Sequence, residues 1–154
     1  MAHFARILRS GVSSWNAVRI GFEFDYEGGA ADVYVLCDDG TLVAFEAKLE
    51  RWRAALHQAY RTRCFAQRAY VVLPRRVAAR AAAYEHEFVR RRVGLCTIDD
   101  SGAITVLIDC AVGAPLQPWI NERAVAELSR GKGGRCRQIQ DSKASLARSV
   151  PLAA

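Results

Sequence analysis

Apolar and polar side chains alternate along residues 19–27, which is the period-two pattern of a half-buried β-strand. One face of this strand would carry Ile20, Phe22, Phe24 and Tyr26. The other face would carry Gly21, Glu23, Asp25 and Glu27. After a Gly28-Gly29 turn, residues 31–36 and 41–48 predict two further strands. We therefore expect an antiparallel meander of three strands.

The spacing of apolar residues becomes helical after the third strand. Within residues 51–66, the positions that recur at intervals of three and four are Trp52, Ala55, Leu56 and Ala59. Residues 69–73 form a short continuous apolar run, typical of a strand covered on both faces, and Pro74 ends it. Residues 75–88 predict a second helix, with an inner stripe of Val77, Ala81, Tyr84 and Phe88.

Weaker patterns complete the series of expected elements. Residues 3–10 and 122–128 predict short helices, and residues 94–98 and 103–110 predict a β-hairpin. The order is then helix, three strands, helix, strand, helix and hairpin. This order predicts an α/β fold with a mixed sheet flanked by helices.

Composition limits the class of protein. The chain has 154 residues, of which 51% are apolar, enough for one ordinary core. We expect a single domain at residues 1–128 and a flexible basic tail at residues 129–154. No apolar run approaches the ~20 residues that span a bilayer, and the N-terminal pattern is not that of a secretory signal. The five cysteines are scattered and include no CxxC pair, so we expect reduced thiols in a cytoplasmic protein.

The net charge of +6 is divided unevenly along the chain. Residues 19–50 carry eight acids and two bases, whereas residues 51–84 carry eight arginines and no acid. This division suits a cation site beside a surface that binds a polyanion, so nucleic acid is the expected partner. The alternative is that the arginines only solvate two helices.

The candidate chemistry lies in the hairpin of residues 32–48. If Asp38-Asp39-Gly40 is a three-residue loop, Asp32 falls opposite Glu46, and Lys48 projects from the same face. A two-residue loop would send Asp32 and Glu46 to opposite faces. Glu46 and Lys48 could also be an exposed salt pair on a strand. However, Glu46 lies in the apolar run VAFEAKL, where an unpaired charge is costly.

Two facing carboxylates repel each other, so a proton, Lys48 or a bound cation must offset the repulsion. Carboxylate oxygens with open coordination positions suit Mg²⁺ or Mn²⁺, which keep several waters and bind substrate phosphate. A metal held there can activate water and stabilise charge on a scissile phosphate. The residues therefore indicate a metal-dependent site for phosphodiester hydrolysis.

The spacing of Asp32 and Glu46-Ala47-Lys48 resembles the motif of the PD-(D/E)XK, or restriction-endonuclease-like, nuclease superfamily. That family has one acid on the second core strand and (D/E)-x-K on the third, followed by a helix and a strand. Residues 15–75 match this order, with Ala31 in the place of the proline. The resemblance implies a restriction-endonuclease-like core of order αβββαβ, here with a C-terminal β-hairpin. It also implies a Mg²⁺-dependent endonuclease or exonuclease that hydrolyses DNA rather than RNA.

The resemblance assigns roles to individual residues. Asp32 and Glu46 would bind the metal, with help from the backbone carbonyl of Ala47. Lys48 would be the catalytic lysine.

Two further positions of the family pattern have counterparts here. Many members carry another acid upstream, and we expect Glu23 to be this metal ligand, with Asp25 and Glu27 as alternatives. Gln58 resembles the glutamine that some branches carry on the following helix, although Thr62 stands where those branches have tyrosine.

Arginines of the helix after the motif are candidates for phosphate contacts: Arg51, Arg61, Arg53 and Arg63. Helical spacing places Arg51 and Arg61 near Gln58 and points the other two elsewhere. A homodimer is compatible with a nuclease that cuts both strands of a duplex. The competing hypothesis is a nuclease-fold module that binds nucleic acid without cleaving it, or that acts as a subunit or regulator.

Overall fold

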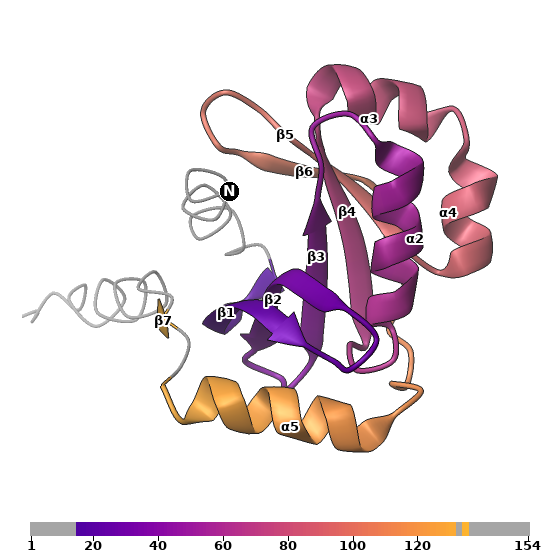
Figure 1. Ribbon diagram of the computed structural model, residues 1–154. Coiled ribbons are helices and arrows are strands. Elements are labelled where there is room, and N and C mark those ends of the chain that lie inside the picture. Colours follow the sequence, from indigo (N-terminus) through magenta and orange to yellow (C-terminus); the bar gives the residue numbers. More distant parts are fainter. Residues whose placement is uncertain (1–14, 132–133, 136–154) are drawn as a thin grey trace, which may run out of the picture.

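The computed structural model describes residues 15–131 and 134–135, which form a mixed β-sheet with helices packed against it (Figure 1). The strands are β1 Ala17–Asp25, β2 Ala30–Cys37, β3 Leu42–Ala47, β4 Arg68–Pro74, β5 Gly94–Ile98, β6 Ile104–Ile108 and β7 Gly134–Arg135. The helices are α2 Trp52–Thr62, α3 Arg75–Ala82, α4 Glu85–Arg91 and α5 Pro118–Ser129. The α/β class with a mixed sheet is confirmed. The helix expected at residues 3–10 lies outside the described residues.

The sheet has the strand order β6-β5-β4-β3-β2-β1-β7. The first three strands form the expected antiparallel meander. Helix α2 then carries the chain across to β4, which pairs parallel with β3, and α3 and α4 lead to β5, which pairs parallel with β4. The expected hairpin, β5 with β6, is antiparallel and extends this same sheet.

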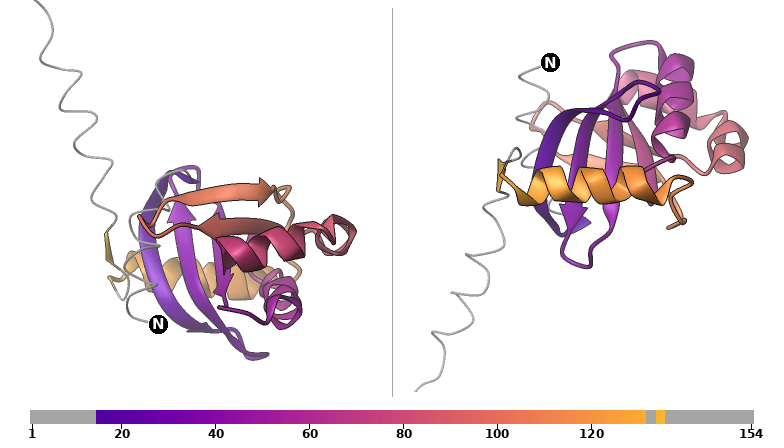
Figure 2. Two further views of the ribbon diagram at one scale, coloured as in Figure 1. Left: turned by 90° about the horizontal axis from the view of Figure 1, so that it is seen from above. Right: turned by 60° about the horizontal axis from the view of Figure 1, so that its bottom comes forward.

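The described helices pack on one face of the sheet, which we call the helical face. Side chains of α2, α3 and α4 share a core with β4 and β5. Helix α5 lies across the meander (Figure 2), where Ala124 and Leu128 share a core with Tyr34. The opposite face carries a core of strand and loop side chains around Trp15. No helix of the described part is long and apolar enough to cross a membrane.

Strand β1 departs from the alternation that its sequence predicts. Ile20 packs on the face opposite the helices, whereas Phe24 packs on the helical face, with its ring centroid 4.8 Å from that of Phe65. Between them, Glu23 has a left-handed backbone with a φ of 53°. A left-handed residue rotates the extended chain about its axis. The alternation of side chains between the two faces therefore changes phase at this residue. The prediction that the apolar residues of this strand share one face is therefore wrong.

The helix expected at residues 75–88 is divided into α3 and α4. The break lies at Ala83-Tyr84, where the Tyr84 N–H donates to the Ala81 carbonyl at 2.9 Å in a tight turn. The Tyr84 ring lies 5.2 Å from the Trp52 ring of α2 and is 41% exposed, so Tyr84 is not part of an inner stripe. The local sequence contains no helix breaker, and packing against α2 accompanies the break instead.

The ends of the other helices also differ from the expectations. Helix α2 ends at Thr62 rather than at residue 66, because the Thr62 hydroxyl and carbonyl take part in a closing turn with Ala59 and Phe65. Helix α5 begins at Pro118, four residues earlier than expected, since proline suits the first turn of a helix. Beyond α5, Gly134–Arg135 pairs with β1. Ser129, the first residue of the expected flexible tail, ends α5, and residues 132–133 and 136–154 of that tail lie outside the described residues.

Candidate active site

The β2–β3 hairpin has the register that the candidate site requires. Val33 pairs with Phe45 and Leu36 pairs with Leu42. The Cys37 N–H donates to the Thr41 carbonyl at 2.9 Å, so pairing continues to these two residues and the loop between them holds three residues, of which Gly40 has a left-handed φ of 86°. One step beyond Val33 and Phe45, this register places Asp32 opposite Glu46 on neighbouring strands. The prediction of a three-residue loop is therefore confirmed, and we call Asp32 and Glu46 the carboxylate pair.

The backbone of β3 holds Asp32 in place. The last paired residues of the two strands are Val33 and Phe45. Two residues after Phe45, the backbone N–H of Ala47 donates to Asp32 Oδ2 at 3.0 Å. The Asp32 carboxylate thus accepts the Ala47 N–H just beyond the last backbone pair of β2 and β3. The contact limits the orientation of Asp32, which is half-buried.

Glu46 is the unusual member of the pair. Its residue is 0% exposed, because β3 lies between β2 and β4 in the middle of the sheet. Neither carboxylate oxygen makes a hydrogen bond of good geometry, although the Asp32 carboxylate lies near enough to accept one from a protonated Glu46. Burial raises the pKa of Glu46 to about 8, the neighbouring Asp32 carboxylate adds to the rise, and the charge of Lys48 opposes it. A buried polar group without a partner costs free energy, so this side chain requires an explanation beyond folding.

Lys48 follows the last residue of β3 and is half-buried. Its backbone N–H donates to the Val72 carbonyl of β4 at 3.3 Å, which extends the contact with β4 one residue past the strand. The charge of Lys48 lowers the pKa of Glu46, so the ammonium group lies close enough to act on this carboxylate. The structure therefore brings together the three side chains of the sequence motif.

The donor set fits a hard divalent cation that retains water. Magnesium is commonly bound by one or two carboxylates together with waters and substrate phosphates. Asp32 and Glu46 supply two carboxylates, and both oxygens of Glu46 lack any other partner. Within residues 15–131, no group of three His, Cys, Asp or Glu side chains could hold a metal ion. The fit is thus to a site of two carboxylates, with the backbone carbonyl of Ala47 as the candidate third oxygen.

The expected upstream acid does not join the carboxylate pair. Glu23 lies on β1 between Phe22 and Phe24, which pair with Val33 and Ala31, so its backbone is level with Asp32. Glu23 is exposed, however, and its left-handed backbone breaks the alternation of side chains along the strand. It forms no three-acid group with the pair in the described part of the chain.

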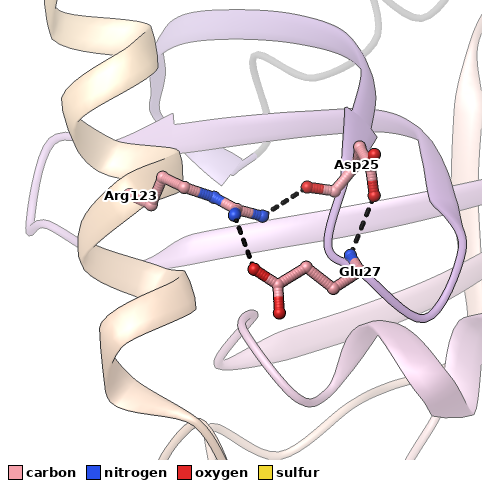
Figure 3. A network of polar contacts seen from close by, with 3 residues as sticks. All are labelled: Asp25, Glu27 and Arg123. Atoms are coloured by element: carbon pink, nitrogen blue, oxygen red, sulfur yellow. Dashed lines mark hydrogen bonds and ion pairs between the residues drawn. The ribbon is translucent and has the colours of Figure 1, made fainter.

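The alternative upstream acids, Asp25 and Glu27, contact helix α5 (Figure 3). Arg123 of α5 donates to Glu27 Oε1 at 3.1 Å and to the backbone carbonyl of Asp25. The Asp25 carboxylate accepts the Glu27 N–H at 2.8 Å. We call Asp25 and Glu27 the turn acids. Their contacts account for both side chains without a metal.

Gln58 is half-buried on α2, which packs against β3 and β4. Its side chain makes no hydrogen bond within the described residues. The structure therefore places Gln58 on the helix that covers the end of β3 but gives it no specific partner.

The candidate phosphate-binding arginines divide into two groups. Arg61 lies beside the Gly28-Gly29 turn, where a Cβ on Gly28 would be 3.4 Å from its Nη2. Arg51 is exposed just before α2. The other two arginines contact other parts of the protein. Arg53 lies over the Trp52 ring at 4.1 Å, and Arg63 donates to the Arg91 carbonyl at 3.2 Å.

Tyr26 is a neighbour of the site that the sequence did not indicate. Burial raises the pKa of its phenol, the Arg61 guanidinium lowers it, and the Glu46 carboxylate raises it. Tyr26 therefore lies near both Glu46 and Arg61. The sequence placed it among the apolar residues of β1, and only the left-handed Glu23 and the following turn bring it to the helical face.

Comparisons with known proteins bear on the fold. No family model matches the sequence, and no curated protein is similar to it. Among solved structures, the chain is similar to the SPO1766 protein of unknown function from Silicibacter pomeroyi, with a TM-score of 0.62 and 17% sequence identity. The likeness covers 96% of this chain and 93% of that chain. At this identity it supports the mixed α/β architecture and carries no conclusion about activity.

Proposed function

We propose that the protein is a metal-dependent nuclease that hydrolyses phosphodiester bonds, in DNA rather than RNA. The observation that carries the proposal is Glu46: a fully buried carboxylate, without a hydrogen-bond partner, directly across from a second carboxylate. Without a metal, burial and the facing Asp32 favour a proton on Glu46, as its raised pKa indicates. A divalent cation bound between Asp32 and Glu46 would replace this proton and would use both carboxylates as ligands.

Each side chain of the motif would have a separate task. Asp32, oriented by the Ala47 N–H, and Glu46 would hold Mg²⁺ or Mn²⁺. When bound, such a cation lowers the pKa of a coordinated water and stabilises negative charge on the phosphate. Lys48 would position the attacking water and screen the charge that develops on phosphorus. The water oxygen would bond to phosphorus as the P–O bond breaks, and one proton of the water would pass through solvent to the departing oxygen, which leaves a phosphomonoester and a hydroxyl group.

A non-cleaving module is the second candidate function. It is favoured by one observation, the lack of a third acid beside the carboxylate pair within residues 15–131. Such a module would bind nucleic acid through the arginines that follow the hairpin, or act as a subunit or regulator. Its binding would weaken steeply with salt, because phosphate contacts release counterions.

Cleavage of plasmid and oligonucleotide DNA with Mg²⁺ or Mn²⁺ tests the proposal. We expect Lys48→Ala to lower the cleavage rate by about 10²–10³-fold, the usual loss when one group that stabilises developing charge is removed. Glu27→Gln is the matched control, since it alters an exposed acid of the turn that contacts α5 instead of the carboxylate pair. Equal rates for wild type and Lys48→Ala would refute the active site. Salt-sensitive binding without metal-dependent cleavage would favour the non-cleaving module.

A further inference from the structure

A hollow of about 510 Å³ opens where the start of α2 meets the break between α3 and α4. Its walls are formed by Glu50, Trp52, Arg53, Arg80, Ala83 and Tyr84. We call it the aromatic hollow. Its volume falls within the range of small-molecule and nucleotide sites. The hollow depends on the helix break, which turns Tyr84 away from the core.

Aromatic rings line the hollow and continue into the core. The Trp52 ring stacks on Phe88 with centroids 5.8 Å apart and an interplanar angle of 20°. It also lies 5.2 Å from the Tyr84 ring, at an angle of 32°. Phe88 and Trp52 are buried, whereas Tyr84 is 41% exposed. The series of rings thus ends in a ring that solvent reaches, and a planar aromatic ligand can stack on the part of it that the Arg53 guanidinium, 4.7 Å from its centroid, does not cover.

One charged group of the hollow, Arg80, favours an anion. The Arg53 guanidinium lies 4.1 Å from the Trp52 ring centroid and 4.7 Å from that of Tyr84, and Glu87 is 3.6 Å from it. Arg80 has no hydrogen-bond or ion-pair partner in the described part of the chain. Glu50 is the acid of the walls. Arg53 is thus already paired with Glu87, whereas the unpaired guanidinium group of Arg80, next to an exposed ring, matches the phosphate and the base of a nucleotide.

The hollow lies close to the carboxylate pair along the chain. Trp52 follows Lys48 by four residues, so their Cα atoms are at most about 14 Å apart. Leu49, between them, is 75% exposed and offers an apolar contact on the way. One nucleic-acid strand can therefore span both places.

We propose that the aromatic hollow binds an unpaired nucleotide, so that the substrate of the protein is single-stranded nucleic acid or a single-stranded end. The base would stack on Tyr84, and Arg80 would contact a phosphate. The base must be unpaired because both faces of a base inside a duplex are covered by its neighbours. That the same strand reaches the carboxylate pair rests on the proposed nuclease function, whereas binding in the hollow does not.

Binding to metal-free protein in EDTA tests the hollow without any cleavage. Fluorescence anisotropy would compare a labelled single-stranded oligonucleotide with a blunt, fully paired hairpin. We expect Tyr84→Ala to weaken binding of the single strand by about 5–150-fold, the range for loss of one base–aromatic stack. Hairpin binding should change much less. Tyr84→Trp should retain single-strand affinity, because it preserves a stacking ring.

A second variant tests the phosphate contact and does not alter the aromatic rings. We expect Arg80→Gln to weaken single-strand binding and to reduce the slope of log K against log salt concentration by about 0.7. The matched control is Arg90→Gln, which removes the same charge from an exposed position of α4 outside the hollow. Arg90→Gln should change the affinity less than twofold. Circular dichroism would check that each variant is folded.

Three results would overturn the proposal: unchanged single-strand affinity in Tyr84→Ala, equal losses for the strand and the hairpin, or competition by polyglutamate as strong as by the oligonucleotide. The last result would identify an acidic-peptide site instead.

The proposed hollow and the proposed nuclease activity can be refuted separately. Tyr84-dependent binding without metal-dependent cleavage would keep the hollow and reject the nuclease. Lys48-dependent cleavage with normal single-strand binding by Tyr84→Ala would do the reverse.

Discussion

The carboxylate pair and the turn acids come from the same three-stranded meander, yet their surroundings are opposite. The Glu27 side chain is 72% exposed and forms an ion pair with Arg123 of α5. Glu46 is 0% exposed and has no partner for either oxygen. Contacts with the rest of the protein thus account for the turn acids and for Asp32, which accepts the Ala47 N–H, but not for Glu46. The difference identifies Glu46 as the acid of this segment that the contacts of the fold do not explain.

Position in the sheet explains this difference. The turn acids lie at the end of β1, beside solvent and α5, where an arginine can reach them. Glu46 lies on β3, with β2 on one side and β4 on the other, below the helices of the helical face. Exposed ion pairs contribute little to stability, while a buried carboxyl group must keep a proton or bind a cation. The two pairs should therefore respond differently to pH, metal and mutation.

The largest expected effect is the pH dependence of stability in the metal-free protein. The pKa of Glu46 is raised from 4.5 to about 8, so the folded protein holds a proton here that the unfolded chain has lost. The free energy of unfolding should therefore fall as pH rises from 5 to 8, by up to about 1.4 kcal/mol per pH unit. Urea denaturation across this range would measure the slope.

Two variants sharpen this test. Glu46→Gln removes the titrating group and should abolish the slope, although Asp32, Lys48 and Tyr26 still surround the position. Glu27→Gln should keep the slope of the wild type. A wild-type slope in Glu46→Gln would show that Glu46 is not the group that titrates.

A smaller effect is expected from metal. At pH 8, Mn²⁺ at about 100 times its dissociation constant should stabilise the wild-type protein by about 2.7 kcal/mol, because it binds the folded state alone. Glu46→Gln should lose this gain, and Glu27→Gln should retain it. Thermal denaturation with and without Mn²⁺ provides the measurement. An equal gain in all three proteins would mean that the metal binds elsewhere.

The smallest effect should come from the turn acids themselves. Glu27→Gln weakens an ion pair that is exposed on both sides, so the free energy of unfolding should fall by less than about 1 kcal/mol. The loss should shrink further at high salt, which screens exposed charges. Chemical denaturation at low and high salt would measure both. If Glu27→Gln lowered the free energy of unfolding by several kcal/mol at both salt concentrations, the turn acids and the carboxylate pair would not differ as described.

The sequence by itself determined the meander and the α/β class, and it favoured the observed register of the β2–β3 hairpin without excluding the one that a two-residue loop would give. These features depend on short-range patterns: alternation, an apolar run, and a glycine placed where a three-residue loop needs a left-handed residue. Because side chains alternate along a strand, the register also placed Asp32 against Glu46. The motif was thus predictable from residues 32–48.

The tertiary structure alone decided which other side chains surround the motif. Beyond the left-handed Glu23, the side chains of β1 point to the opposite faces of the sheet. Tyr26 therefore lies near Glu46. Asp25 and Glu27 contact Arg123, which is nearly a hundred residues away in the chain. The break before Tyr84 likewise accompanies packing on Trp52. Neither event has a local cause in the sequence, since glutamate and tyrosine rarely favour these conformations. Contacts between distant segments supply the free energy that local propensity does not, and these contacts form only once the sheet and helices have assembled.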